Sequence, residues 1–329
     1  MATIRDVAAA AGVSATTASR ALSGNGRVSR ATIVRVGIAV NALDYQPNEI
    51  ARSLLSKRTM TLGLVVPDIT NPFFPELVAG AERAASALER TIFLVEARSA
   101  ERARHAIGLL RGRAVDGIIV IGNPFPSAAD LLTAVGSIPL IVVDRAASTS
   151  EISTVCCDHF NGGNVGVDHL VGLGHKRIMH LAGPVAADVS AQRVHGYEFA
   201  MRSHGLTPHV VPAGFGITGG AAAVEALLAD HVPFTALTAA NDLSAIGAMR
   251  ALSQAGLSVP GRVSVVGYDD IQMASFVSPA LTTVRQPSAD LGSQAVELIA
   301  RQIKGETKVI RRVLPVELVE RESTGRANS

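Results

Sequence analysis

Residues 3–20 read TIRDVAAAAGVSATTASR, a pattern of two short helical stretches separated by one glycine. Thr3 can cap the first helix, and Asp6 lies in its first turn, where the helix dipole favours negative charge. Gly12 ends that helix, and Ser14 can cap the second. Two short helices joined by a tight turn that contains glycine are typical of a helix-turn-helix. The predicted helices cover residues 4–11 and 15–21.

The second of these helices carries side chains suited to reading DNA. In a helix-turn-helix the second helix enters the major groove, and its first residues meet the base edges. Those residues are Ala15, Thr16 and Thr17, with Arg20 one turn further on. An arginine can donate two hydrogen bonds to guanine, and an alanine or threonine methyl group can contact the methyl group of thymine. Spacing alone leaves open a helical hairpin that contacts no DNA.

Basic residues are concentrated at the same end of the chain. Residues 1–58 hold eight lysines and arginines against three acidic residues, whereas the remainder holds 22 basic and 25 acidic residues. This asymmetry favours a basic module for nucleic acid joined to a nearly neutral body, although a basic face can also be merely solvated.

Several blocks in this region resemble the LacI–GalR family of repressors. They occur in the family's order and spacing, at residues 3–8, 11–14, 17–20, 28–29 and 43–48. The resemblance implies a DNA-binding headpiece over residues 1–58 that includes a hinge helix at about 47–56. It also implies that Leu54 wedges into a central minor-groove step, where unstacking costs a few kcal/mol. The expected DNA contacts are Thr3, Ala15, Thr16, Thr17, Ser19, Arg20, Asn48, Arg52, Leu54 and Lys57.

From residue 60 onward, short apolar runs alternate with helical stretches. Nearly continuous apolar strands alternating with helices indicate parallel sheets covered on both faces, and so many units suggest two α/β lobes. The expected strands are 61–67, 91–96, 117–121, 140–143, 177–182, 236–239, 263–267 and 282–284. The expected helices are 74–89, 100–111, 162–173, 190–204, 218–229 and 243–255.

This body resembles the periplasmic sugar-binding fold that forms the core of LacI-type regulators. The blocks that carry the resemblance are residues 66–74, 169–175, 240–242, 265–270 and 281–287. It implies an effector-binding and dimerisation domain over residues 59–329. One lobe is expected to span about 60–157 and 287–316, and the other 158–286 and 317–329.

Polar residues follow several predicted strands, where ligands bind in sheets of this kind. They are Asp144 and Arg145 after one strand, Asn241 and Asp242 after another, Asp269 and Asp270 after a third, and Gln286 after a fourth. Together with nearby phenylalanines they offer paired donors, acceptors and flat apolar walls, which a polyol requires. For Asp242 and Asp270 the alternative of a helix N-cap stays open.

The resemblance also implies a particular set of ligand residues. Ten residues match positions that hold ribose in the similar ribose-binding proteins: Asn71, Phe73, Phe74, Asp144, Arg145, Arg193, Phe215, Asn241, Asp269 and Gln286. We therefore expect a pentose or another monosaccharide as the effector. A purine or nucleoside is the alternative, because sister regulators use the same cleft for bases. The pair Asp144 and Arg145 favours a sugar, since a free base has no vicinal diol.

An NAD-dependent α/β oxidoreductase is a distant alternative, because residues 214–219 fit G-x-G-x-x-G. The match lies past the middle of the chain, and no acidic residue lies about 20 positions later at a strand end, since Thr235 and its neighbours are neutral. We therefore expect a protein that is not an enzyme and has no cofactor. The histidines show no metal-like spacing, so His175 and His180 are expected to pack or cap. The adjacent Cys156 and Cys157 suit neither a disulfide framework nor a zinc site, and we expect ordinary residues at a strand end.

The location and assembly of the chain follow from absent signals. No apolar run of about 18 residues predicts a membrane span, and the first residues lack a signal-peptide core. A cytoplasmic, nucleoid-associated protein is therefore expected, rather than a secreted binding protein. The tail carries no apolar heptads, which favours a homodimer over a coiled-coil tetramer. Its partners are expected to be a double-stranded, pseudo-palindromic operator and the small effector, which alters operator affinity by moving the lobes.

Overall fold

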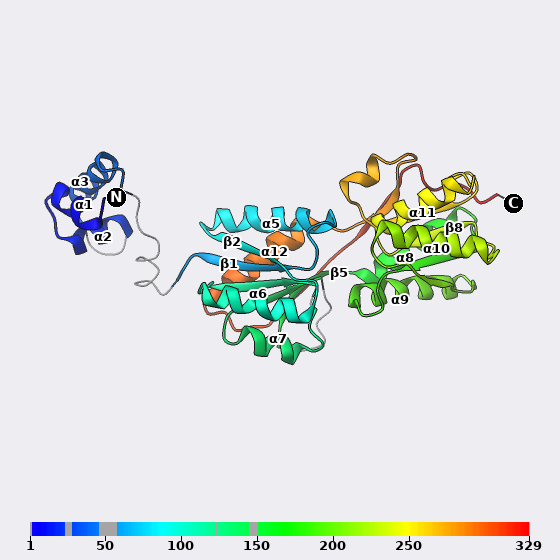
Figure 1. The fold of residues 1–329 in the computed structure, drawn as a ribbon, viewed down its shortest axis with the longest axis horizontal. Coiled ribbons are helices and arrows are strands. Elements are labelled where there is room, and N and C mark those ends of the chain that lie inside the picture. The colour runs from blue at the N-terminus through cyan, green and yellow to red at the C-terminus, as the bar shows by residue number, and fades with distance from the viewer. Residues whose placement is uncertain (1, 24–27, 46–57, 123, 145–150, 329) are drawn as a thin grey trace. The chain divides into compact units, whose positions relative to one another are not determined.

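The computed structural model describes residues 2–23, 28–45, 58–122, 124–144 and 151–328. The chain divides into two compact units, residues 1–59 and 60–329 (Figure 1).

The described residues of the smaller unit form three helices, α1 (Ile4–Ala11), α2 (Ala15–Ser23) and α3 (Arg30–Ala42), which are called the three-helix domain below. Thr3 and Asp6 form a capping box at the start of α1, and Gly12 ends that helix with a φ of 65°. The hydroxyl of Ser14 accepts a hydrogen bond from the Thr17 amide at 3.1 Å at the start of α2. The predicted helix pair is thus confirmed, with α2 two residues longer than expected. The core of the domain contains Val7, Ala18 and Val36, all fully buried.

The described residues of the larger unit form two six-stranded sheets. The strands of the first are β1 (Thr61–Val66), β2 (Thr91–Glu96), β3 (Gly117–Ile121), β4 (Leu140–Val143), β5 (Ser153–Cys157) and β11 (Arg311–Leu314). Those of the second are β6 (Ile178–Ala182), β7 (Val210–Pro212), β8 (Ala236–Ala239), β9 (Ser264–Asp269), β10 (Thr282–Arg285) and β12 (Glu317–Val319). The first sheet has the order β11-β5-β4-β3-β1-β2 and its pairings are parallel. The second has the order β12-β10-β9-β8-β6-β7, and β12 pairs antiparallel with β10.

Helices cover both faces of each sheet, which confirms the predicted parallel α/β architecture. In the amino-terminal lobe these are α5 (Phe73–Ala87), α6 (Ala100–Gly112), α7 (Ala128–Val135) and α12 (Ser288–Ile303). In the carboxyl-terminal lobe they are α8 (His159–Gly172), α9 (Asp188–Ser203), α10 (Ile217–Ala229) and α11 (Asp242–Gln254), with a 3₁₀ turn at Gln272–Ser275. The inner strands β3, β4 and β8 are largely apolar and buried along their whole length, as a sheet between two helix layers requires. The edge strands β2, β7, β11 and β12 are partly exposed.

Alternate side chains of each strand point to opposite helix layers. In β3, Ile119 belongs to the core cluster shared with α5 and α12, whereas Ile118 and Val120 belong to the cluster beneath α6 and α7. The first of these clusters continues into the second lobe beneath α10 and α11. One apolar core therefore underlies both lobes.

The chain passes between the two lobes three times: after β5, after β10 and between β11 and β12. Figure 1 shows the lobes beside one another with these segments between them. The polar residues expected to bind the effector follow β4 in one lobe and β8, β9 and β10 in the other. Since β8, β9 and β10 are neighbours in one sheet, their carboxyl ends bring those residues together.

Candidate functional site

Arg193 lies at the centre of a buried polar cluster. It comes from α9, and only 3% of its surface is exposed. Its guanidinium carbon lies 3.7 Å from the centroid of the Tyr268 ring, a short cation–π contact. Its Nη1 donates a hydrogen bond to the carbonyl of Ala240 and lies 3.7 Å from Oδ1 of Asp269. The arginine therefore ties α9 to the ends of β8 and β9.

Asp269 ends β9 with a φ of 111°, a backbone conformation that few non-glycine residues adopt. Its Oδ1 accepts a hydrogen bond from Nε2 of Gln286 at 2.7 Å. Burial raises the pKa of Asp269 to about 7, although Arg193 and Gln286 both act to lower it. Oε1 of Gln286 is buried and has no hydrogen-bond partner among the described residues. This acceptor is available to a hydroxyl or amide of a bound molecule.

Asp144 brings the amino-terminal lobe to the same cluster. It follows β4 with a φ of 58°, and its Oδ1 lies 2.8 Å from Nε2 of His159, the first residue of α8. The other ring nitrogen of His159 lies 3.2 Å from the hydroxyl of Tyr268 and 3.4 Å from Nε of Arg193. Burial alone would raise the pKa of Asp144, but His159 and Arg193 hold it below its ordinary value. Burial lowers the pKa of His159 despite the neighbouring carboxylate, so its ring is neutral.

Three further residues after strands have structural roles. Asn241 caps α11, because its Oδ1 accepts a hydrogen bond from the Ser244 amide at 3.0 Å, while its Nδ2 donates to the carbonyl of Phe215. Asp242 is fully buried and accepts hydrogen bonds from the Ile271 amide and the Thr283 hydroxyl. Asp270 pairs with Arg285 and Arg321. The N-cap alternative for Asp242 and Asp270 is therefore wrong, since the cap of α11 is its neighbour Asn241 and Asp270 holds two arginines.

The expected aromatic walls have different exposures. Phe73 is 3% exposed and belongs to the lobe core, whereas Phe74 is half-buried and meets it edge-on, with ring centroids 5.2 Å apart. Asn71 accepts a hydrogen bond from the Phe73 amide at 3.1 Å and so orders the start of α5. Phe215 is half-buried and packs on Gly183, where a methyl group would lie 2.4 Å from its ring.

The structure thus brings Asp144, Arg193, Asp269 and Gln286 into one connected cluster, with Asn241 beside Phe215. Arg145 lies outside the described residues. Sequence reasoning missed His159 and Tyr268. His159 is the second residue after β5. From the sequence, only Cys156 and Cys157 were placed at a strand end there, and no strand range was predicted. His159 was therefore not recognised as a polar residue that follows a strand, as Asp144 and Gln286 were.

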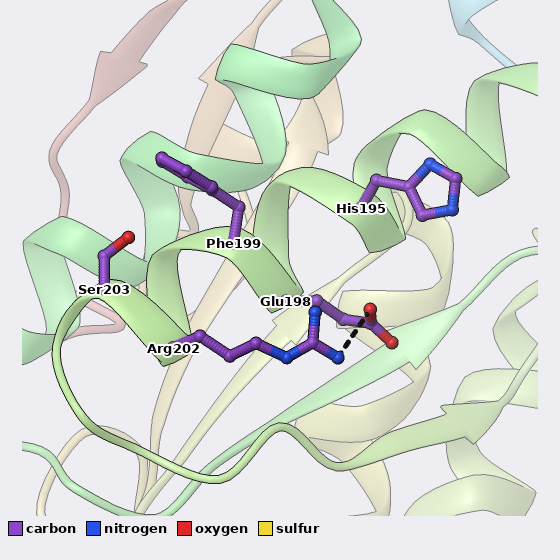
Figure 2. Close-up of a pocket in the computed structure, with 5 residues that line it drawn as sticks. All are labelled: His195, Glu198, Phe199, Arg202 and Ser203. Carbon is purple, nitrogen blue, oxygen red and sulfur yellow. Dashed lines mark hydrogen bonds and ion pairs between the residues drawn. The ribbon is translucent and has the colours of Figure 1, made fainter.

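A separate hollow of about 470 Å³ lies on the outer side of α9 (Figure 2). It is lined by His195, Glu198, Phe199, Arg202 and Ser203. Glu198 and Arg202 pair with each other at 3.0 Å across one helical turn, and their side chains reach solvent. We favour the buried cluster as the ligand site, because the hollow on α9 is open and its charges already pair at the surface.

In the three-helix domain, the expected DNA-reading residues lie at different depths. Thr16 and Arg20 are exposed on α2, and Ser19 is half-buried. Ala15 packs against the core of the domain, and the hydroxyl of Thr17 lies 2.8 Å from that of Ser14. Thr3 caps α1. The remaining expected contacts, Asn48, Arg52, Leu54 and Lys57, lie outside the described residues, as does the hinge helix.

The other residues singled out in the sequence are structural. His175 contacts Thr235, Ser264 and the Gly325 carbonyl, and His180 stacks on Tyr197, where burial lowers its pKa to about 3. Cys156 and Cys157 are free thiols buried in β5, as expected of ordinary residues there. Among the described residues no group of acidic, cysteine or histidine side chains has the arrangement of a metal site. A search of the same residues for helices long and apolar enough to span a membrane found none.

Two families match this chain, and together they cover most of it. Residues 3–48 match the bacterial regulatory proteins of the lacI family. Residues 59–322 match the periplasmic binding proteins and sugar binding domain of the LacI family.

Individual relatives are similar to this chain in sequence or structure along most of its length. The ribose operon repressor of Escherichia coli (strain K12) is 34% identical over 93% of this chain and 94% of its own. That of Halalkalibacterium halodurans is 35% identical over 98% and 97%. The Lac repressor dimer bound to operator and the anti-inducer ONPF superposes with a TM-score of 0.90 at 30% identity, covering 98% of this chain and 99% of that one. A regulator from Enterococcus faecium with bound ribose gives a TM-score of 0.75 at 31% identity, over 82% and 100%. The chain therefore belongs to the LacI family of DNA-binding transcriptional regulators.

Proposed function

We propose that the chain is a repressor whose effector is a pentose, with D-ribose the first candidate. The observation that carries this proposal is the buried cluster of Asp144, Arg193, Asp269 and Gln286, which presents charged donors and acceptors at facing ends of both lobes. The names of the relatives support it, since two of those above are ribose operon repressors and a third was solved with ribose. Family membership rules out the NAD-dependent oxidoreductase.

The chemistry of a pentose fits these groups. Carboxylates of Asp144 and Asp269 would accept hydrogen bonds from sugar hydroxyls, and the guanidinium of Arg193 would donate to their oxygens. The free Oε1 of Gln286 would accept one more. We assign Phe74 and Phe215 as apolar walls. Asn71, Phe73, Arg145 and Asn241 complete the proposed ligand set.

On the DNA side, two copies of the chain would place two headpieces on a pseudo-palindromic operator in the cytoplasm, at the nucleoid. Residues 1–58 would read the DNA, and residues 59–329 would bind the effector and form the dimer. Thr16 and Arg20 would meet base edges from the exposed side of α2. Leu54 of the proposed hinge helix, at about 47–56, would wedge into the central step. The effector would change operator affinity by moving the amino-terminal lobes.

A thermal-shift screen of the purified chain tests the effector. The screen compares D-ribose with other pentoses, hexoses, sugar phosphates, purines and nucleosides. A ligand at about 100 times its Kd adds roughly 2.7 kcal/mol to the stability of the domain that binds it. We expect a rise with D-ribose that Arg193→Ala abolishes. Arg202→Ala, on the same helix but at the surface, should keep it. A rise with a purine and none with sugars would overturn the pentose assignment.

Operator selection from random DNA tests the reading helix. Arg20→Ala should relax the base preference at one position of each half-site, because a bidentate contact with guanine contributes about 1–3 kcal/mol of discrimination. Lys57→Ala should weaken all sequences about equally, as expected for a phosphate contact. An unchanged selection profile with Arg20→Ala would show that this arginine does not read a base.

A further inference from the structure

His159 is the side chain through which the two lobes meet in the polar cluster. It begins α8, immediately after the chain leaves the first sheet at β5. Its side chain is fully buried, and its two ring nitrogens face different lobes. Nε2 lies 2.8 Å from Asp144, which follows β4 of the amino-terminal lobe. Nδ1 lies 3.2 Å from Tyr268 of β9 and 3.4 Å from Arg193 of α9, both in the carboxyl-terminal lobe.

The neighbours of the ring fix which nitrogen carries the proton. Arg193 has only donors, so Nδ1 can bond to it only as an acceptor. A neutral imidazole has one donor and one acceptor, which leaves the proton on Nε2, where it donates to the carboxylate of Asp144. Protonating Nδ1 would place an N–H group against the guanidinium and add a second positive charge beside it. The arrangement is therefore satisfied in one protonation state.

The backbone around the histidine is shaped to allow these contacts. A methyl group at Gly162 would lie 2.2 Å from the Tyr268 hydroxyl, and one at Gly163 would lie 2.2 Å from the Arg193 carbonyl. The two glycines of α8 thus let Tyr268 and α9 approach the start of the helix closely. The ring of Tyr268 in turn supports the guanidinium of Arg193 from one side.

We propose that His159 is a positioning residue that orients Asp144 and Arg193 together, so that the halves of the effector site contributed by the two lobes are aligned for one sugar. This inference rests on the proposed pentose function. Asp144 and Arg193 would each meet different hydroxyls. A loss of their alignment therefore impairs the recognition of hydroxyl stereochemistry as well as affinity.

Two substitutions separate the two bonds of the ring. Glutamine in His159→Gln can place an amide near the Nε2 position and keep the bond to Asp144, but it leaves nothing near Nδ1. Asparagine in His159→Asn can do the reverse. Calorimetry on the full chain gives the Kd values for D-ribose and for D-xylose, its epimer at one carbon. His195 is an exposed histidine on α9, and His195→Gln is the matched control.

We expect each His159 variant to weaken D-ribose binding roughly 10- to 100-fold, as expected for losing a hydrogen bond to a charged group. Each should also reduce the ratio between the Kd values for D-xylose and D-ribose, whereas His195→Gln should change neither. If both sugars weaken by the same factor, or if D-ribose binding is unchanged, His159 does not position these groups.

A second readout needs no sugar. The ¹⁵N resonances of the His159 ring, identified by their loss in His159→Gln, should show a proton on Nε2 and a hydrogen-bonded, unprotonated Nδ1 at pH 7. A proton on Nδ1 would overturn the inference. If the unaltered chain binds no D-ribose, the pentose assignment fails, and this measurement still decides the role of His159.

Discussion

Three buried aspartates of the body differ in pKa because they differ in partners. All lie at the ends of strands or just beyond and are less than 8% exposed. Asp144 has His159 and Arg193 beside it, and its pKa is held low. Asp242 has only amide and hydroxyl donors, and burial raises its pKa well above the ordinary value. Burial also raises the pKa of Asp269, to about 7, although Arg193 and Gln286 act to lower it. A charged Asp144 beside a titrating Asp269 gives the cluster a pH-sensitive acceptor.

The affinity for D-ribose should rise with pH through about 7. Sugar hydroxyls donate to the charged form of Asp269, so binding favours the carboxylate, while below pH 7 the free protein carries a proton that binding must release. Well below pH 7, the affinity for D-ribose should change by almost tenfold per pH unit. Calorimetry between pH 6 and 8, in buffers with different heats of ionisation, measures both the affinity and the released proton.

Asp269→Asn is the control for this prediction. An amide has no proton to lose in this range, so the variant should bind D-ribose more weakly and with a flat pH profile. An equal slope in the variant would assign the titration to another group. In the protein without ligand the sign is reversed. The folded state holds a proton that the unfolded state has already lost between about pH 4 and 7, so the free energy of unfolding falls as pH rises through that window.

At the scale of elements, close contact between helices depends on glycines without a side chain. A methyl group at Gly163 of α8 would lie 2.2 Å from the carbonyl oxygen of Arg193 in α9, a backbone atom that cannot turn away. At Gly172, in the last turn of α8, nothing lies within 4 Å of such a methyl group. The same substitution in one helix should therefore have opposite consequences.

Gly163→Ala should lower the stability of the body by about 1–3 kcal/mol, the usual effect of overpacking. Gly172→Ala should be neutral or add up to about 1 kcal/mol, because alanine favours a helix over glycine. The midpoints of urea unfolding measure both changes. Equal shifts of the unfolding midpoint in the two variants would mean that the backbones of α8 and α9 are not in close contact at Gly163.

The sequence predicted elements well where apolar residues were continuous. The predicted bounds of β3 agree with the structure, because its five apolar or glycine residues are all buried between helices. No range was predicted for β5 beyond a strand end at its two cysteines, since Ser153 and Thr154 interrupt the apolar run. β11 was not predicted either, because it begins with two arginines at the edge of its sheet. α12 was overlooked although Leu291, Ala295 and Leu298 mark a buried face at helical spacing.

The site was predictable to the extent that its residues follow strands. Asp269 and Gln286 could be placed at the carboxyl edge of one sheet, and Asp144 at that of the other, from their positions alone. The stacking of Arg193 on Tyr268 could not, because the two are 75 positions apart and nothing local marks either as a partner. Asn241 and Asp242 also follow a strand, but their adjacent positions did not reveal that their roles differ. Asn241 caps α11, whereas the buried Asp242 accepts a hydrogen bond from the Ile271 amide.

At the scale of the whole molecule, the two lobes of the body are joined both by the chain and by their packing. The chain crosses between them three times, and one apolar core lies beneath both. Direct polar contact between the lobes occurs where the effector is proposed to bind, through Asp144 and His159. An effector that contacts both sides of this point can therefore favour one arrangement of the lobes, and only by as much as its affinity differs between the arrangements.

The coupling between effector and operator should be reciprocal. If saturating D-ribose changes the Kd for a selected operator by some factor, the operator must change the Kd for D-ribose by the same factor, which for such systems is typically about 5- to 150-fold. Fluorescence anisotropy gives the first ratio and calorimetry the second. Arg193→Ala should bind the operator with an affinity that D-ribose does not change, because the sugar no longer binds. Tight binding of D-ribose with no effect on operator affinity would show that both arrangements bind the sugar equally, and D-ribose would then be a ligand of the body without being its effector.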